Sequence, residues 1–503
     1  MLKLFDGLKH LNTIYLKSEL KPFQFAEFIF LILVAFFIPI SWRIASYVMI
    51  GLFVSTILKG VFEEGFKNNP LQYNNRIIYI IFIAFWVLYA VSFVYSENSA
   101  EARVQIGKKL PFLLFSLFFL CSNLSYLTKD RVKTIMYGFV CGILTLLLIN
   151  LVWAGYDIIF NDNDITRLTM PYRFFKTNET IFTYVHRAYF SIFTCFGFVF
   201  CFVELFSDNN IRTKVFDLVS SIIFILVPFY LMSRSGVLCT ILLLFVFLFW
   251  ITFIRKEKKI GIISCIIILS SLIIGCIAFP KSIERFQNTI KNVKTGKGDC
   301  RLTLRSASRS ILVDNFLFGV GAGDRSSETL NAFHKYKNEM VSRMLPPNDV
   351  DVEYYISHRQ KLLDSIHARY ENSYNDIVYR YIDSISKIDK CDYSSVKHNL
   401  VEYQIVKHCI KYELNAHNQY IETRITVGVL GLVLLLALFL FPIYMWIRNK
   451  NFDIMLFSLI LIFMLNCLFE SIFERQMGIM FFVFFYLLLF HADFCQQTTD
   501  NGQ

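Results

Sequence analysis

Long apolar runs separated by short polar connectors dominate this chain of 503 residues. Each run is about 17–22 residues long, the length that a helix needs to cross the hydrocarbon core of a bilayer. The sequence contains about 12 such runs, starting near Phe25, Ile44, Ile77, Leu110, Val132, Ala188, Phe216, Val237, Ile260, Val427, Ile454 and Gly478. The first follows a polar, lysine-bearing stretch without a small-residue cleavage site, so we expect an uncleaved helix and no signal peptide. The pattern predicts an all-α, polytopic membrane protein.

One polar segment is far longer than the other connectors. It runs from Pro280 to Thr423, about 140 residues, well beyond an ordinary connection. Helical spacing of apolar residues over Arg301–Asn315 and again over Tyr354–Leu414 predicts a small helical cap without a β-sheet. We therefore expect three parts, with about nine helices in the first and about three in the last: a membrane domain at residues 1–279, a loop or cap at 280–423, and C-terminal membrane helices at 424–503.

Composition agrees with a membrane protein and argues against a nucleic-acid binder. Hydrophobic residues make up 55% of the chain, more than a soluble domain of this length can bury. The formal net charge is +11, but much of the excess sits in short connectors such as Arg255–Lys259 and Arg448–Lys450, as the positive-inside rule predicts. With the N-terminus inside, these connectors face the cytoplasm and 280–423 faces the other side. Most of the 12 cysteines lie inside apolar runs, and their spacing predicts neither a disulfide nor a metal site.

The most informative short segment is Ala416–Leu432, where polar residues directly precede an apolar run. A neutral imidazole such as that of His417 can accept a proton from a sugar hydroxyl near neutral pH. Asn418 beside it can hold hydroxyls by hydrogen bonds. The alternative is that the two residues simply cap a helix that begins at Tyr420.

Arginines provide the candidate anion sites. Arg234 lies between two apolar runs in Ser233–Gly236, where a charge is costly and commonly paired. Its guanidinium suits phosphate oxygens, although a snorkelling interfacial arginine is an equal alternative. Arg301, Arg305 and Arg309 recur at every fourth position and share one helix face, which is either an anion site or a solvated stripe.

Two further polar clusters border membrane runs. Glu470, Glu474, Arg475 and Gln476 fall in the turn between the last two runs, where they either form a solvated hairpin tip or enter the bundle with a partner. His186-Arg187 opens another run. The loop histidines show no His-x-x-x-His pair with carboxylate support, so we expect no metal.

Taken in order, these segments resemble the O-antigen ligase family of bacterial envelope enzymes, which shares a domain with O-antigen polymerases. The resemblance covers most of the chain from about Phe93 onward, and the ordered set is more specific than any one motif. The motifs are Tyr95–Asn98, His186–Tyr189, Ser233–Gly236, Arg301 with Asn315–Asp324, Ala416–Tyr420 with Gly428–Gly431, and Glu470–Gly478.

The resemblance implies a GT-C-like membrane glycosyltransferase with a large periplasmic loop in the bacterial inner membrane. Such enzymes move a glycan from undecaprenyl pyrophosphate to lipid A-core or to a growing glycan, with no cofactor and, in the ligases, no metal. Arg234 and Arg301 would bind the pyrophosphate, and His417 would activate or position the acceptor hydroxyl. The substrate-binding residues that we expect around them are Asn418, His186, Arg187, Arg305, Glu470, Arg475 and Gln476.

Other functions remain open at this stage. An O-antigen polymerase or a protein O-oligosaccharyltransferase would share the donor and differ only in the acceptor. A polysaccharide flippase would also have about a dozen helices with intramembrane cations. The long cap on one face disfavours a flippase, because transporters rarely need such a segment. The stretch between Asp324 and His417 is longer and more charged than the family leads us to expect, so we expect acceptor specificity to reside there.

Overall fold

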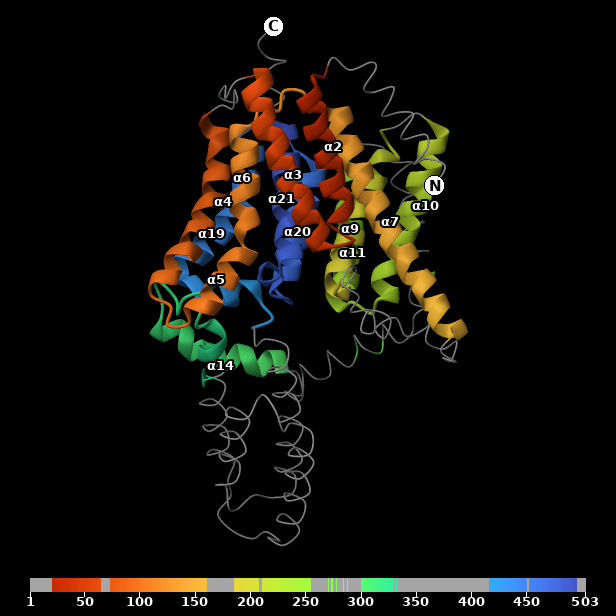
Figure 1. Cartoon of the computed structure of the whole chain (residues 1–503). Helices are drawn as coiled ribbons and strands as arrows, with labels where there is room; N and C mark the ends of the chain where they lie inside the picture. The colour runs from red at the N-terminus through yellow and green to blue at the C-terminus, as the bar shows by residue number, and fades with distance from the viewer. Residues whose placement is uncertain are drawn as a thin grey trace, which may run out of the picture. The chain divides into compact units, whose positions relative to one another are not determined.

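The computed structural model describes residues 20–64, 73–160, 185–207, 210–254, 300–329, 331–332, 416–449 and 452–494, with six positions between 270 and 287. Every regular element within these ranges is a helix and none is a strand, which confirms the all-α prediction (Figure 1). The elements are α2 (Pro22–Phe37), α3 (Trp42–Lys59), η1 (Gly60–Glu64), α4 (Tyr73–Val91), η2 (Ser92–Val94), α5 (Ser99–Lys108), α6 (Leu110–Cys121), α7 (Lys129–Phe160), α9 (Arg187–Glu204), α10 (Ile211–Tyr230), α11 (Arg234–Phe249), η4 (Trp250–Ile254), α14 (Cys300–Asp314), α19 (Gln419–Asn449), α20 (Ile454–Cys467), η5 (Ile472–Glu474) and α21 (Gln476–Phe494).

The helices have the length and composition of membrane spans. Within the described ranges, 9 helices are long and apolar enough to cross a membrane, and α2 and α20 are shorter apolar helices. These helices coincide with all but one of the predicted apolar runs. The run near Ile260 lies outside the described residues. The chain is therefore a multi-pass membrane protein, as predicted.

The chain divides into two compact units. The first, called the membrane unit below, comprises Met1–Lys291, Asn315–Asp324 and His417–Gln503, and the second comprises Asn292–Asp314 and Arg325–Ala416. In the second unit, α14 forms the helix that the sequence predicts near Arg301. The helical stretch predicted at Tyr354–Leu414 lies outside the described residues. The boundaries at 280 and 423 stay a prediction, but Asn315–Asp324 belongs with the membrane helices.

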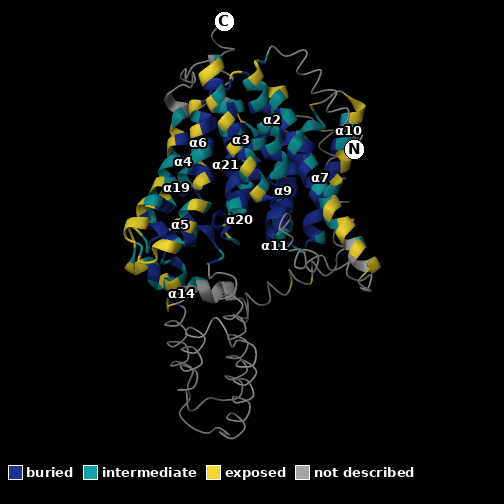
Figure 2. Cartoon of the chain, viewed as in Figure 1, coloured by how far each residue is buried: buried dark blue, intermediate teal, exposed yellow. Residues whose placement is uncertain are grey.

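Two helices form the centre of the membrane unit. α9 and α21 each have 83% of their span buried, far more than their neighbours (Figure 2). Rings of Phe139 in α7, Phe196 in α9 and Phe481 and Phe485 in α21 contact one another, with centroids 4.6–5.8 Å apart. Because lipid is as apolar as a protein core, close ring packing of this kind holds membrane helices together more than hydrophobic burial does.

Small residues allow the closest helix crossing. Gly138 and Gly142 in α7 face α2, and a Cβ atom at Gly142 would lie 2.2 Å from the Phe36 carbonyl oxygen. This small-xxx-small spacing lets two membrane helices approach backbone to backbone. It explains why α2, although short, is held firmly against α7.

A buried ionic cluster joins α2, α3 and the α6–α7 connection. Lys59 and Glu27 form a buried ion pair. Glu27 also accepts hydrogen bonds from Thr56 (2.7 Å), Ser122 (2.9 Å) and Tyr126 (2.7 Å). A buried ion pair is tolerated when its remaining hydrogen-bond donors and acceptors have partners, as they do here. The cluster fixes the end of the bundle at which α3 and α6 end and α7 begins with Lys129, Arg131 and Lys133.

The stretch from Ser96 to Lys109 is helical although its sequence resembles that of a loop. Glu101, Arg103 and Lys108 interrupt the apolar pattern, but α5 occupies most of it. The Asn98 Oδ1 accepts a hydrogen bond from the Glu101 N–H at 3.1 Å and so caps the helix. α5 and α6 together make one span, Ser99–Cys121.

Candidate functional site

His417 lies just before α19 in a strained conformation. Its φ of 45° places it in the left-handed region, which among described non-glycine residues only Met232 shares. Such a backbone costs about 1–3 kcal/mol and persists where the surrounding structure enforces it, often at functional sites. The Nδ1 atom lies 3.1 Å from the Oε2 atom of Glu470. The two side chains are 27% and 20% exposed, so the pair is accessible from outside the core.

Asn418 caps α19, as the simpler of the two sequence interpretations proposes. Its Oδ1 accepts a hydrogen bond from the Ile421 N–H at 3.0 Å. Its Nδ2 donates to the Leu468 carbonyl at 3.2 Å, so the side chain also ties α19 to the end of α20. Asn418 is buried. Its role in the structure is therefore to fix His417 beside Glu470.

The turn that carries Glu470 is anchored from several sides. Glu474 is buried and pairs with Lys109 at 3.2 Å, and the Lys109 ammonium lies 4.4 Å from the centre of the Tyr89 ring. The Oε1 of Gln419 accepts a hydrogen bond from the Phe473 N–H at 2.7 Å. Glu474 and η5 therefore enter the bundle with a partner, which corrects the alternative of a solvated hairpin tip. Arg475 is exposed.

The start of α9 joins the same turn. The Tyr189 hydroxyl donates to the Ile472 carbonyl at 3.1 Å, and the charges of Glu470, Glu474 and Arg475 all act on it. Gly478 permits this approach because a Cβ there would lie 2.6 Å from the Ile472 carbonyl oxygen. His186 caps α9, since its Nδ1 accepts from the Ala188 N–H at 3.4 Å, a long hydrogen bond. Arg187 is the next residue, at the first position of the helix.

Gln476 is held at the opposite side of the turn. Its Nε2 donates to the Ser46 hydroxyl of α3 at 3.1 Å. This bond connects the start of α21 to the start of α3. Gln476 is thus placed next to Arg475 but is engaged with the bundle.

Arg234 begins α11, which runs parallel to α9. Ser233 caps this helix, since its Oγ accepts from the Gly236 N–H at 3.3 Å. A Cβ at Gly236 would lie 2.6 Å from Ser191, and one turn later the Thr240 hydroxyl lies 3.4 Å from the Cys195 Sγ. From the first contact to the second, the chain moves four residues forward in both α9 and α11. The two helices therefore run in the same direction and begin at the same end of the bundle. Arg234, half-buried, lies at that end with Arg187.

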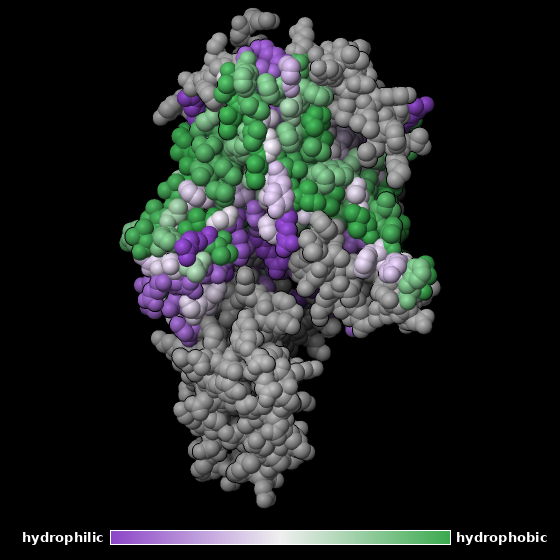
Figure 3. All heavy atoms as spheres, in the orientation of Figure 1, coloured by the Kyte–Doolittle hydropathy of each residue, from purple (hydrophilic) through white to green (hydrophobic). Residues whose placement is uncertain are grey.

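The arrangement favours an anion. α9, α11, α19 and α21 all begin at this end, and helix N-termini carry partial positive charge and unpaired N–H donors. Arginines stand at or next to three of these starts: Arg187, Arg234 and Arg475. Figure 3 shows hydrophobic residues over the flanks of the membrane unit and hydrophilic residues gathered toward the end where α5 lies. This end is suited to a polar, negatively charged group.

Arg301 and Arg305 belong to α14 in the second unit. They recur one turn apart on one helix, as the sequence predicts, but the side chain of Arg301 is not among those described. The two arginines are thus not among the residues that the membrane unit brings together.

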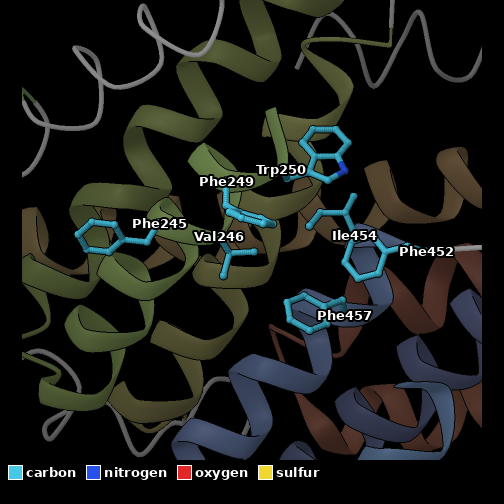
Figure 4. A pocket seen from close by; sticks show the side chains of 7 residues that line it. All are labelled: Phe245, Val246, Phe249, Trp250, Phe452, Ile454 and Phe457. Carbon is cyan, nitrogen blue, oxygen red and sulfur yellow. The ribbon is translucent and has the colours of Figure 1, made fainter. Parts of the chain in front are cut away.

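The opposite end of α11 and α20 carries an apolar pocket (Figure 4). Its lining comes from the last turns of α11, from η4 and from the start of α20. Because no polar side chain other than the Trp250 indole lines it, it offers no acid, base or anion-binding group. The lining residues are Phe245, Val246, Phe249, Trp250, Phe452, Ile454 and Phe457.

Sequence reasoning missed the residues that support the site from behind. Lys109 borders an apolar run without any motif around it, although a lysine within a span indicates a buried partner. Gln419 was passed over because a single glutamine carries no pattern. Among the described residues, no group of three His, Cys, Asp or Glu side chains is placed to hold a metal ion.

Comparison with known proteins identifies one domain. Residues 219–354 match the family model described as O-antigen ligase. The matched range contains Arg234, Arg301 and Arg305 and ends before His417. No curated protein matches the chain. Within this all-α membrane fold, residues 219–354 are therefore similar to the O-antigen ligase family.

Proposed function

We propose that this protein transfers a glycan from undecaprenyl pyrophosphate to an acceptor hydroxyl, and that its reaction is O-antigen ligation to lipid A-core. The family supports a membrane glycosyltransferase of the ligase or polymerase type. The observation that carries the chemistry is the His417–Glu470 pair, with Nδ1 and Oε2 at 3.1 Å. A carboxylate at one ring nitrogen is the arrangement that orients an imidazole for base catalysis.

In the proposed reaction, the acceptor hydroxyl gives its proton to Nε2 of His417, across the ring from Glu470. Glu470 accepts the Nδ1–H hydrogen bond and stabilises the imidazolium that forms. The acceptor oxygen forms a bond to the anomeric carbon, while the bond from that carbon to the phosphate oxygen breaks. The bonding electrons leave with the undecaprenyl pyrophosphate, and the configuration at the anomeric carbon inverts.

The leaving group needs positive charge rather than a base. Arg234, Arg187 and Arg475 would hold the pyrophosphate together with the helix N-termini at this end of the bundle. Arg301 and Arg305, which belong to the second unit, stay predicted ligands of the donor pyrophosphate. Fixed guanidinium groups meet the developing charge without reorganisation, so positioned cations and one base suffice for this step.

The site end is proposed to face the periplasm from the bacterial inner membrane. Lys129, Arg131 and Lys133 in the first turns of α7 lie at the end marked by Glu27 and Lys59, and so does Arg448 in the last turn of α19. The positive-inside rule assigns that end to the cytoplasm. His417, Glu470 and Arg234 lie at the other end. Lipid-linked glycans and lipid A-core would meet there.

Transfer by the purified protein tests the proposal. The assay uses an undecaprenyl-linked glycan, lipid A-core and EDTA, and compares the wild type with His417→Ala and Glu470→Gln. Glu204→Gln is the matched control, because Glu204 forms an ion pair with Lys133 at the far end of α9. We expect glycan on lipid A-core with the wild type and the control only. Full activity of His417→Ala would remove the imidazole from the mechanism.

The product separates the related functions. Longer glycan on the lipid carrier, without transfer to lipid A-core, would identify an O-antigen polymerase. Glycan on a hydroxyl of a protein acceptor would identify a protein O-oligosaccharyltransferase. Movement of the donor across a vesicle membrane without any transfer would identify a flippase. The stretch between Asp324 and His417 is proposed to select among the acceptors.

A further inference from the structure

α19 is broken near its start, and a distant loop fills the break. Val427 (φ −127°, ψ 17°) and Gly428 (φ 70°, ψ −164°) are non-helical. The following part, Val429–Asn449, is long enough at about 1.5 Å per residue to cross a hydrocarbon core of roughly 30 Å by itself. The preceding part, Gln419–Thr426, is polar. The break therefore marks the membrane boundary on this helix.

The loop that fills the break is Asn315–Asp324. Its Val320 and Gly321 N–H groups donate to the Ile425 and Thr426 carbonyls at 2.8 and 2.9 Å. In return, the Val429 N–H donates to the Phe316 carbonyl at 2.9 Å. The groups that the broken helix leaves unpaired are thus paired by the loop.

The other side of the loop is fixed to the α4–α5 connection. The Ala322 and Gly323 N–H groups donate to the hydroxyls of Ser92 and Ser96, both at 3.1 Å. The Tyr95 hydroxyl donates to the Phe318 carbonyl at 2.7 Å. Non-helical backbone is tolerated next to lipid only when its polar groups are paired in this way.

The side chains of Phe316, Leu317 and Phe318 point outward. They are 50%, 53% and 58% exposed, an unusual amount for three consecutive large apolar residues. They lie at the start of an exposed apolar stripe on α19, with the spacing of a single helix face. The stripe consists of Leu430, Val433, Leu440, Tyr444 and Ile447.

We propose that Phe316-Leu317-Phe318 is a re-entrant membrane anchor that inserts into the lipid leaflet at this end of the bundle. The partner is the acyl region of that leaflet just below the headgroups. The anchor continues the lipid-facing stripe of α19 beyond the helix break. It also holds residues 315–324 at the membrane.

Photo-crosslinking in native membranes tests the anchor. A benzophenone amino acid is incorporated in place of Leu317, in place of Val433 as the lipid-facing control, and in place of Ser125 as the water-facing control. Ser125 is exposed and lies between the spans Ser99–Cys121 and Lys129–Trp153. After irradiation, phospholipid adducts are measured by mass spectrometry. We expect adducts at Leu317 within threefold of those at Val433, and at least tenfold fewer at Ser125.

An adduct yield at Leu317 as low as that at Ser125 would overturn the proposal. Crosslinks from Leu317 to protein in place of lipid would overturn it too, since they would identify a protein-covered surface. The measurement needs no transfer activity, so its outcome is independent of the proposed function. Because Leu317 is exposed, the larger benzophenone side chain leaves the backbone hydrogen bonds of the loop intact, and the expected level of protein in the membrane is that of the wild type.

Discussion

The Nδ1 atom of His417 and the Oε2 atom of Glu470 lie 3.1 Å apart, although 53 residues separate them in the chain. Asn418 ties the start of α19 to the end of α20 and so sets this distance. A carboxylate bound at Nδ1 fixes both the tautomer and the direction of the ring. The pair thus gives His417 a defined orientation before any substrate binds.

Glu470→Gln is expected to lower kcat for glycan transfer by about 100-fold, because an amide cannot stabilise the imidazolium as a carboxylate does. KM for the lipid-linked donor should change by less than about threefold, since the acceptor base does not hold the pyrophosphate. Steady-state kinetics with purified protein measures both. A rise in KM at unchanged kcat would instead assign Glu470 to substrate binding.

Lys109 and Glu474 are expected to be coupled in stability. Lys109→Met leaves the Glu474 carboxylate buried without its partner, which should cost about 3–5 kcal/mol of unfolding free energy. Adding Glu474→Gln should recover part of that loss. Thermal unfolding of the single and double variants in detergent gives the coupling energy.

The matched control is Lys133→Met, which breaks a partly exposed pair with Glu204. It should cost no more than about 1 kcal/mol. If Lys109→Met were as mild as this control, the anchoring of the Glu470 turn would not depend on the buried pair.

The membrane spans and the outline of the site could be predicted from the sequence, because both depend on local patterns. Apolar runs locate the helices, and His417, Arg234 and Glu470 stand out as polar residues beside such runs. α5 could not be predicted this way, because its charged residues look like a loop until the Asn98 cap and the Asp324 contact are known. Asp324 accepts from the Glu97 and Asn98 N–H groups at 2.8 and 2.9 Å, across more than 220 residues.

The hydrogen-bond partners of the glycine-rich segment could not be predicted from the sequence either. The glycines of Gly319–Asp324 are typical of a tight turn, yet its hydrogen bonds go to Ile425, Thr426 and Ser92, none of which carries a pattern that points to it. The cap formed by Asn418 could be proposed from the sequence, but its contacts with Ile421 and Leu468 could not. Substrate binding by Asn418 stays a prediction.

Gly428→Ala is expected to destabilise the membrane unit by about 2 kcal/mol or more. The φ of 70° disfavours any side chain, and a Cβ would lie 2.0 Å from the Leu317 carbonyl oxygen. Thermal unfolding measures the loss. Gly107→Ala in α5 is the control: no atom lies within 4 Å of its Cβ, so that variant should be neutral or slightly stabilised. Equal melting temperatures for the two variants would contradict the tight fit of the loop in the helix break.

Arg234→Ala is expected to abolish transfer while leaving the protein in the membrane, because the side chain starts α11 but does not cap it. Arg234→Lys should restore only a small part of the rate, since a lysine ammonium is a point charge and cannot bind two phosphate oxygens side by side. Donor titrations should show a KM increase of at least tenfold for Arg234→Lys, about 1.4 kcal/mol of lost binding. Ser233→Ala is the informative companion, because it removes the cap of α11 at a cost of about 1 kcal/mol and keeps the guanidinium. If Ser233→Ala lost transfer as completely as Arg234→Ala, activity would depend on the position of the helix start and not on the charge of Arg234. If Arg234→Ala bound the lipid-linked donor normally, the pyrophosphate would have to bind elsewhere.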